Sequence, residues 1–192
     1  MNPRGFALFD TAIGACGVAW SERGVVGVQL PEKSRAAARS RLARRFPGAE
    51  EAAPTPKVAR AIAAITALLR GEARNLAEIE LDLGDVGGFE ARVYDVARTI
   101  APGETLNYGE IAARLGQADA ARAVGQAMGR NPFPIVVPCH RVLGADGKLG
   151  GFSAHGGVET KLKLLAIEGA RIGDAPTLFA DLPIAIAPKA RA

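Results

Sequence analysis

The sequence predicts an α/β (α+β) protein with a strand-rich N-terminal domain, an α-helical second domain and a C-terminal tail. Three observations support this. Short apolar runs between turn residues dominate the beginning of the chain, and longer segments with helical periodicity follow later. The glycine-rich break Gly84-Asp-Val-Gly-Gly88 separates the two patterns. We therefore expect an N-terminal domain over residues 1–88, a second domain over 89–170 and a tail over 171–192.

The first part of the chain predicts three strands, two helices and, after them, one edge strand. The strands are expected over 6–9, 15–20 and 24–30, each bounded by turn residues. An Ala- and Arg-rich segment over 34–46 predicts a helix that Pro47-Gly48 ends, and its five arginines are typical of a solvated helix face rather than of DNA binding. Residues 57–69 predict an amphipathic helix with one apolar side, formed by Ile62, Ile65, Leu68 and Leu69. Apolar and acidic residues alternate over 76–83, as in an edge strand.

The second part predicts three helices, over 89–100, 108–115 and 118–128. A turn at Gly116 between the last two makes them a helix-turn-helix candidate. Residues 174–192 are rich in Pro and Ala without a period, which predicts a loosely packed tail.

The composition is that of an ordinary globular protein, with 48% hydrophobic and 23% charged residues in 192. No apolar run approaches the roughly 18 residues that span a bilayer, and the beginning Met1-Asn-Pro-Arg4 lacks the apolar core of a signal peptide. We therefore expect a cytoplasmic protein without a membrane partner. In a reducing compartment, the two cysteines, Cys16 and Cys139, are expected to be free thiols.

The charge of the chain and its few potential metal ligands say little about binding partners. The first 88 residues contain no His, so the sequence supports no zinc site there, and we expect neither a metal nor another cofactor. A net charge of +4 and a pI near 9.4 are weak evidence for nucleic acid binding. The segment 120–145 holds Arg122, Arg130 and Arg141 and no acidic residue, which fits either a solvated basic face or a DNA contact.

The most informative motif is Ile135-Val-Val-Pro-Cys-His-Arg-Val142. The β-branched run Ile135–Val137 predicts a short buried strand, and Pro138 then forces the backbone to turn at Cys139. Cysteine is a strong nucleophile once ionised, and a nearby imidazole such as that of His140 is the usual means of ionising it. A buried structural Cys beside an unrelated His is the alternative.

The surrounding blocks resemble those of the O6-alkylguanine-DNA alkyltransferases, also called methylated-DNA–protein-cysteine methyltransferases. The resemblance spans about residues 89–170, with the blocks in order and Pro-Cys-His-Arg as the diagnostic core. The blocks are Tyr108-Gly-Glu-Ile-Ala, Ala120-Ala-Arg-Ala-Val-Gly-Gln-Ala-Met-Gly-Arg-Asn-Pro132, Pro134-Ile-Val-Val-Pro-Cys-His-Arg141, Gly150-Gly-Phe-Ser153 and Leu164-Leu-Ala-Ile-Glu-Gly169. The resemblance implies a winged-helix-like second domain.

The resemblance implies that Cys139 accepts the alkyl group and becomes a thioether, so that each molecule reacts once. His140 is implied to deprotonate Cys139 through a bridging water, because adjacent side chains diverge at a turn, while Glu168 holds the other imidazole nitrogen. From the residues alone, Glu168 reads as a solvated carboxylate at a helix end. Asn131, before Pro132, is a helix end that is implied to hold the active-site turn.

The resemblance also implies alkylated double-stranded DNA as the partner, bound by a monomer through the minor groove with the damaged base flipped out. Arg122 would fill the vacated space, with Ala121 among the small neighbours that let the helix approach DNA closely; a base-specific Arg contact is the alternative. Tyr108, otherwise a core residue, would donate to the flipped purine. The Val142 carbonyl would accept from its exocyclic amine, Ser153 would lie near O6, and Phe152 would form an aromatic wall where many relatives have Tyr. We expect His155 to be exposed.

The expected function is direct reversal of O6-alkylguanine and O4-alkylthymine damage. Two rivals remain at this point. A non-catalytic alkyltransferase-like protein would only mark lesions, and a thiol hydrolase would use the Cys139–His140 pair without DNA.

Overall fold

The computed structural model describes residues 3–170, so the expected tail at 171–192 lies outside the described residues. The chain begins with a four-stranded sheet in the order β3-β2-β1-β4. Its strands are β1 (Gly5–Thr11), β2 (Gly14–Trp20), β3 (Val25–Gln29) and β4 (Glu50–Glu51). The first three are antiparallel neighbours, while β4 runs parallel to β1. The three strands predicted over 6–30 are confirmed.

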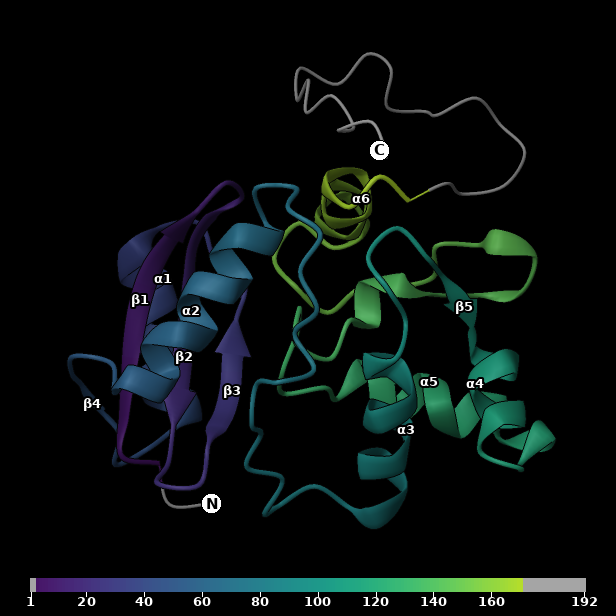
Figure 1. The fold of residues 1–192 in the computed structure, drawn as a ribbon, viewed down its shortest axis with the longest axis horizontal. Coiled ribbons are helices and arrows are strands. Elements are labelled where there is room, and N and C mark those ends of the chain that lie inside the picture. The colour runs from purple at the N-terminus through teal and green to yellow at the C-terminus, as the bar shows by residue number, and fades with distance from the viewer. Residues whose placement is uncertain (1–2, 171–192) are drawn as a thin grey trace.

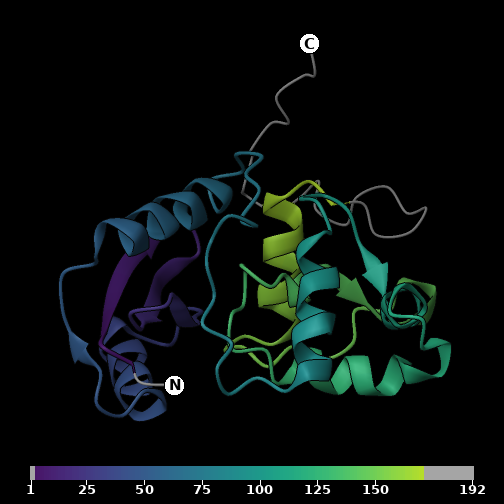
Figure 2. The same ribbon diagram turned by 60° about the horizontal axis from the view of Figure 1, so that its bottom comes forward.

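Two helices, α1 (Arg35–Arg45) and α2 (Pro56–Leu68), cover opposite faces of this sheet (Figures 1 and 2). Both were predicted, and each starts at a hydroxyl cap, Ser34 or Thr55, which accepts a backbone N–H of the first turn. On the α1 face, Phe6, Ala19 and Val26 of the sheet pack against Leu42 and Phe46. A Cβ at Gly17 would lie 2.3 Å from Leu42, so only glycine allows this close approach.

Most arginines of α1 form ion pairs at the surface. Three of the five pair with carboxylates: Arg35 with Asp10 at 2.7 Å, Arg39 with Glu51 at 2.9 Å and Arg41 with Glu32 at 3.1 Å. All three guanidiniums are about half exposed. These contacts agree with the interpretation of a solvated helix face.

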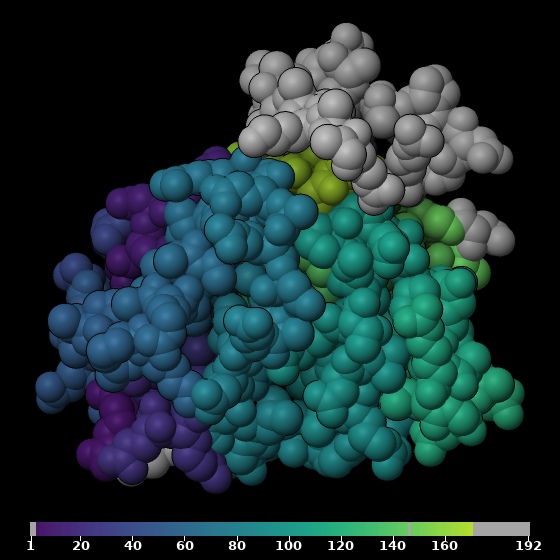
Figure 3. All heavy atoms as spheres, in the orientation of Figure 1, coloured from purple at the N-terminus to yellow at the C-terminus, as the bar shows by residue number. Residues whose placement is uncertain are grey.

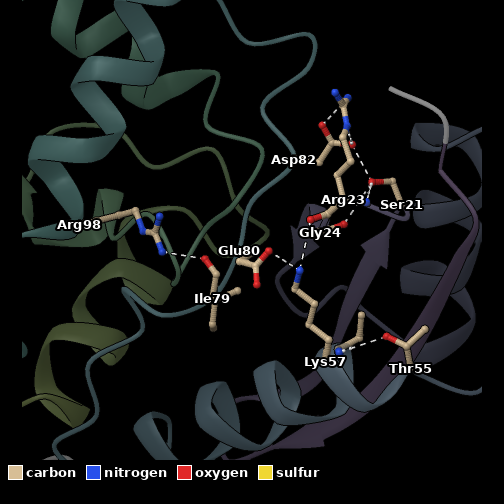
Figure 4. Close-up of polar contacts among 10 residues, drawn as sticks. Ser21, Arg23, Gly24, Thr55, Lys57, Ile79, Glu80, Asp82 and Arg98 are labelled. Carbon is tan, nitrogen blue, oxygen red and sulfur yellow. Dashed lines mark hydrogen bonds and ion pairs between the residues drawn. The ribbon is translucent and has the colours of Figure 1, made fainter.

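The edge strand predicted over 76–83 is wrong. Among the described residues this segment makes a single bridge, between Leu81 and Val25 of β3, and residues 77–79 form a turn. The acidic residues do not all face solvent: Asp82 is buried and accepts hydrogen bonds from Ser21 at 2.6 Å and from Arg23 (Figure 4). Buried polar contacts, rather than a ladder, therefore fix the linker between the two halves, residues 69–87.

The second half is mostly helical. Its helices are α3 (Gly88–Arg98), α4 (Tyr108–Arg114), α5 (Ala121–Gly129) and α6 (Val158–Ile167), with 3₁₀ turns η1 (Ala118–Ala120), η2 (Cys139–Arg141) and η3 (Ala145–Gly147). Two-residue strands β5 (Leu106–Asn107) and β6 (Val142–Leu143) pair in parallel. The predicted helices are confirmed, except that residues 118–120 are 3₁₀. Gly116, at φ +71°, makes the turn between α4 and the η1–α5 segment.

One cluster of buried side chains runs through both halves, from Val28 of β3 and Ile65 of α2 to Val93 of α3 and Phe133. In the space-filling view the two halves abut along the face shown, with the linker between them (Figure 3). The halves are therefore packed against each other rather than merely tethered. Within residues 3–170, no helix is both long and apolar enough to cross a membrane.

Candidate active site

The turn that precedes Cys139 is buried but is not a strand, so the strand predicted over Ile135–Val137 is wrong. Prolines on both sides lack an N–H, which prevents a regular ladder. Instead Val137 N donates to Phe133 O at 2.8 Å, and Ile135 has φ +76°, a strained conformation for a β-branched residue. Asn131 closes the turn, since its Nδ2 donates to Val137 O and its Oδ1 accepts from Phe133 N, both at 2.8 Å.

Cys139 begins the 3₁₀ turn η2, so the predicted change of backbone direction after Pro138 is confirmed. Burial raises the pKa of the Cys139 thiol. A hydrogen bond from the Asn131 side chain, the charge of Lys161 and the N–H groups of Cys139 and His140 act in the opposite direction. The site thus contains the groups that a thiolate needs.

His140 is fully buried, and its Nε2 lies 2.9 Å from Glu168 Oε1. The Glu168 side chain is 2% exposed, so it is not a solvated helix-end carboxylate. Its burial raises its pKa, but the charges and hydrogen bonds of His140 and Arg141 outweigh this and hold the pKa at about 2. The expected His140–Glu168 pair is therefore present in the structure, with an ionised carboxylate.

Arg141 belongs to the same network. It donates Nε to Glu168 Oε2 and Nη2 to Glu168 Oε1, both at 2.8 Å, and Nη1 to Ile100 O at 2.5 Å. Because Arg141 is only 5% exposed, counting it in a basic surface over 120–145 was wrong; Arg122 and Arg130 remain exposed. The other nitrogen of His140, Nδ1, has no hydrogen-bond partner among the described residues, and it makes no direct bond to Cys139.

Sequence reasoning missed Lys161, which is 1% exposed. Its Nζ donates to Val142 O at 2.7 Å and to Leu149 O at 2.5 Å, and its charge lowers the pKa of Cys139. The signal was available: Lys161 stands three and four residues before the buried Leu164 and Leu165, on the apolar side of α6. A lysine there must find internal acceptors.

A cleft of about 270 Å³ opens beside Cys139. Phe152 and the exposed Ser153 line it, as expected for residues that meet a substrate. Residues of the N-terminal half form the opposite side. The full lining is Val28, Gln29, Leu30, Arg41, Arg45, Gly129, Arg130, Asn131, Pro134, Cys139, Phe152, Ser153 and Ala154.

The remaining expected residues lie around this centre. Tyr108 is half-buried at the first position of α4, and its hydroxyl would contact a Cβ placed at Gly150 at 3.7 Å. Burial and the nearby Cys139 raise the pKa of Tyr108. Ala121 and Arg122 begin α5, where Arg122 is exposed and makes no ion pair with a described residue. His155 is exposed, as predicted.

Comparison with known proteins matches this chain to one family. The family model described as the DNA binding domain of 6-O-methylguanine DNA methyltransferase matches residues 88–170. The methylated-DNA–protein-cysteine methyltransferase of Mycolicibacterium paratuberculosis is 52% identical over 102 residues, which are 53% of this chain and 60% of that relative. The Mycobacterium leprae protein of the same name is 47% identical over 121 residues, 63% of this chain and 71% of the relative.

A solved structure extends the likeness over both halves. The crystal structure of Mycobacterium tuberculosis OGT in complex with DNA has a TM-score of 0.68 and 34% identity, and covers 86% of this chain and 92% of that one. The fold and the comparisons thus define the class of protein, the 6-O-methylguanine DNA methyltransferases with their DNA binding domain. The chain belongs to the methylated-DNA–protein-cysteine methyltransferase family.

Proposed function

We propose that this chain repairs DNA by removing alkyl groups from O6 of guanine, and from O4 of thymine, by irreversible transfer to Cys139. Alkyl transfer from DNA to a protein cysteine is the activity of the family to which the chain belongs. The observation that carries the assignment to Cys139 is its place in the cleft beside the buried His140–Glu168 pair. Neither a metal nor a cofactor enters the proposed reaction.

The reaction begins with loss of the thiol proton to His140 through a water molecule at Nδ1, while Glu168 stabilises the imidazolium. The sulfur then attacks the alkyl carbon: an S–C bond forms, the O6–C bond breaks, and its electron pair remains on the guanine. Tyr108 would donate its hydroxyl proton to the leaving guanine, and the proton held by His140 would then return through water to the tyrosinate, so that both side chains end in their starting protonation states. A thioether has no good leaving group, so the protein reacts once.

Binding is proposed to occur on double-stranded DNA, through α5 in the minor groove, with the damaged nucleotide flipped into the cleft. The exposed Arg122, beside Ala121, would occupy the vacated place in the base stack. Phe152 would stack on the flipped base, Ser153 would lie near O6, and the Val142 carbonyl would accept from the exocyclic amine. That carbonyl accepts from Lys161, and a carbonyl oxygen can accept a second hydrogen bond.

The proposal includes a monomeric protein in the cytoplasm. Two free cysteines support a reducing compartment. We assign DNA binding and chemistry to residues 89–170, and support of the site to residues 1–88.

The test is intact-mass analysis after incubation with a duplex containing O6-methylguanine. The protein should gain the mass of one methylene group, on the peptide that contains Cys139. Cys139→Ser should show no gain yet bind the duplex about as tightly, because α5 and the thiol are separate parts of the site. Cys16→Ser is the control and should react normally, because Cys16 is fully buried and its burial raises its pKa to about 12. Methylation of Cys139→Ser, or of Cys16, would refute the assignment.

A further inference from the structure

The strand of the sheet that lies nearest the helical half is β3 (Figure 1). Its outer edge contacts the active-site turn directly: Val28 N donates to Pro132 O at 2.9 Å. Arg45, at the end of α1, donates Nη2 to the same Pro132 oxygen at 2.9 Å and Nη1 to Val28 O at 3.1 Å. Two donors from the N-terminal half thus converge on one carbonyl of the turn.

The Pro132 carbonyl lies at the start of the turn that positions Cys139. Pro132 has no N–H, so its oxygen is its only main-chain polar group. The preceding residue, Asn131, closes the turn through Val137 O and Phe133 N, and its side chain also lowers the pKa of Cys139. The turn holds Ile135 in a strained conformation, which persists only where its surroundings enforce it.

Arg45 differs from the other arginines of α1 that have a partner. Arg35, Arg39 and Arg41 pair with carboxylates, whereas Arg45 donates to main-chain oxygens only. It is half-buried in the wall of the Cys139 cleft, and its guanidinium carbon lies 5.0 Å from the centre of the Phe46 ring, which restricts its orientation. A planar fork that bridges two oxygens is a task for arginine, and lysine performs it poorly.

We infer that Arg45 is a positioning residue for Cys139, through which the N-terminal domain holds the active-site turn in its reactive form. This inference rests on the proposed function. It gives the N-terminal sheet a part in the reaction without contact to the base: Arg45 and Val28 fix Pro132, Pro132 fixes Asn131, and Asn131 stabilises the thiolate.

Arg45→Met tests this, because methionine keeps most of the apolar stem and removes the donors. Two rates are measured between pH 6 and about pH 10: methyl transfer from duplex O6-methylguanine, and alkylation of Cys139 by iodoacetamide without DNA, followed on the Cys139 peptide. Both rates should fall about tenfold near pH 7, which is the effect expected from the loss of one hydrogen bond to a charged group. The loss of rate should become smaller in alkaline solution, and the affinity for DNA should stay unchanged. The rates of Arg45→Lys should lie between those of the wild type and Arg45→Met.

Arg44→Met is the matched control, since Arg44 is the exposed neighbour on the same helix and should behave as wild type. A folded Arg45→Met or Arg45→Lys protein with the wild-type iodoacetamide profile would overturn the inference, as would an equal loss in Arg44→Met. If Arg45→Met does not fold, the rates of Arg45→Lys alone decide whether Arg45 positions Cys139. Failure of the wild type to accept a methyl group would refute the proposed function. The iodoacetamide rates would still test whether Arg45 positions Cys139, because they are measured without DNA.

Discussion

At the scale of single residues, burial and polar contacts act on the Cys139 thiol in opposite directions. Burial alone would keep it protonated and unreactive at neutral pH. The buried Lys161 and the side chain of Asn131 favour the thiolate, and both are fixed by hydrogen bonds to main-chain oxygens. The two side chains that favour the thiolate are therefore held in place by main-chain oxygens of the fold.

His140→Ala should slow methyl transfer by roughly 100-fold near pH 7, within the usual range for loss of a general base. Because burial raises the pKa of Cys139, the variant should recover as alkaline solution ionises the thiol directly. Single-turnover rates measured against pH check this. A constant ratio of variant to wild-type rate across the pH range would remove His140 from thiol ionisation. Glu168→Gln should show the same trend with a smaller loss.

At the scale of elements, short local signals place the residues that we propose to contact DNA. Asn107 and Glu110 form a capping box, Asn107 Oδ1 accepting from Glu110 N at 2.9 Å while Asn107 N donates to Glu110 Oε2 at 2.6 Å. This box sets Tyr108 at the first position of α4. The Tyr108 ring packs beside Gly125 of α5, at ordinary van der Waals distance from where a Cβ would stand. Tyr108 thus lies where α4 and α5 meet.

Arg122→Ala should reduce repair of duplex O6-methylguanine much more than reaction with the free modified base. Flipping a nucleotide costs a few kcal/mol that a free base does not incur, so a loss of about 10- to 100-fold is expected on duplex alone. The two transfer rates are compared for each variant. Arg114→Ala, on the exposed side of α4, controls for the loss of one positive charge. Equal losses on both substrates would assign Arg122 to the fold or the pocket.

Element boundaries show where prediction from sequence succeeds. The starts of α1, α2 and α4 carry local caps and were predicted within a residue. The segments 76–83 and 135–137 were not, because β-branched or alternating residues favour a strand only where a partner edge is available. The first finds a single bridge with β3, and prolines exclude the second from any ladder.

At the scale of the whole molecule, polar contacts of the linker join the halves. Arg98 of α3 donates to the carbonyls of Ala77 at 2.6 Å and Ile79 at 2.8 Å, and Lys57 of α2 pairs with Glu80 (Figure 4). The buried Asp82 pairs with Arg23 at 2.7 Å. The linker therefore behaves as part of the folded core, and loosening it should loosen both halves.

Asp82→Asn should lower the free energy of unfolding at pH 7 by about 1–3 kcal/mol, the cost of weakening a buried, charge-assisted hydrogen-bond group. This corresponds to a fall of roughly 2–12 °C in Tm. Burial raises the pKa of Asp82, but hydrogen bonds from Ser21, Gly84 and Arg23 lower it below the ordinary 3.8. The stabilisation is thus present above that value and is lost as the pH falls through the lower, folded-state pKa. Thermal unfolding from pH 7 to pH 3 should show the variant and wild type converging in acid.

The control for this series is Asp10→Asn, which removes an exposed ion pair with Arg35 and should change Tm little. A constant difference between Asp82→Asn and wild type at all pH values would mean that the carboxylate charge plays no part. A difference no larger than that of Asp10→Asn would mean that the linker does not stabilise the fold.

The sequence by itself predicted the family, Cys139 as the candidate nucleophile beside His140, and the main helices and strands, whereas the pairing of Glu168 with His140 followed only from the family resemblance. The motif and the elements depend on side-chain chemistry and on periodicities within a few residues, which are readable locally. Only the tertiary structure decided that Arg141 is a buried partner of Glu168, that the charge of the buried Lys161 lowers the pKa of Cys139, and that Arg45 reaches Pro132. These are contacts between segments far apart in the chain, formed because buried cations must find acceptors wherever packing supplies them.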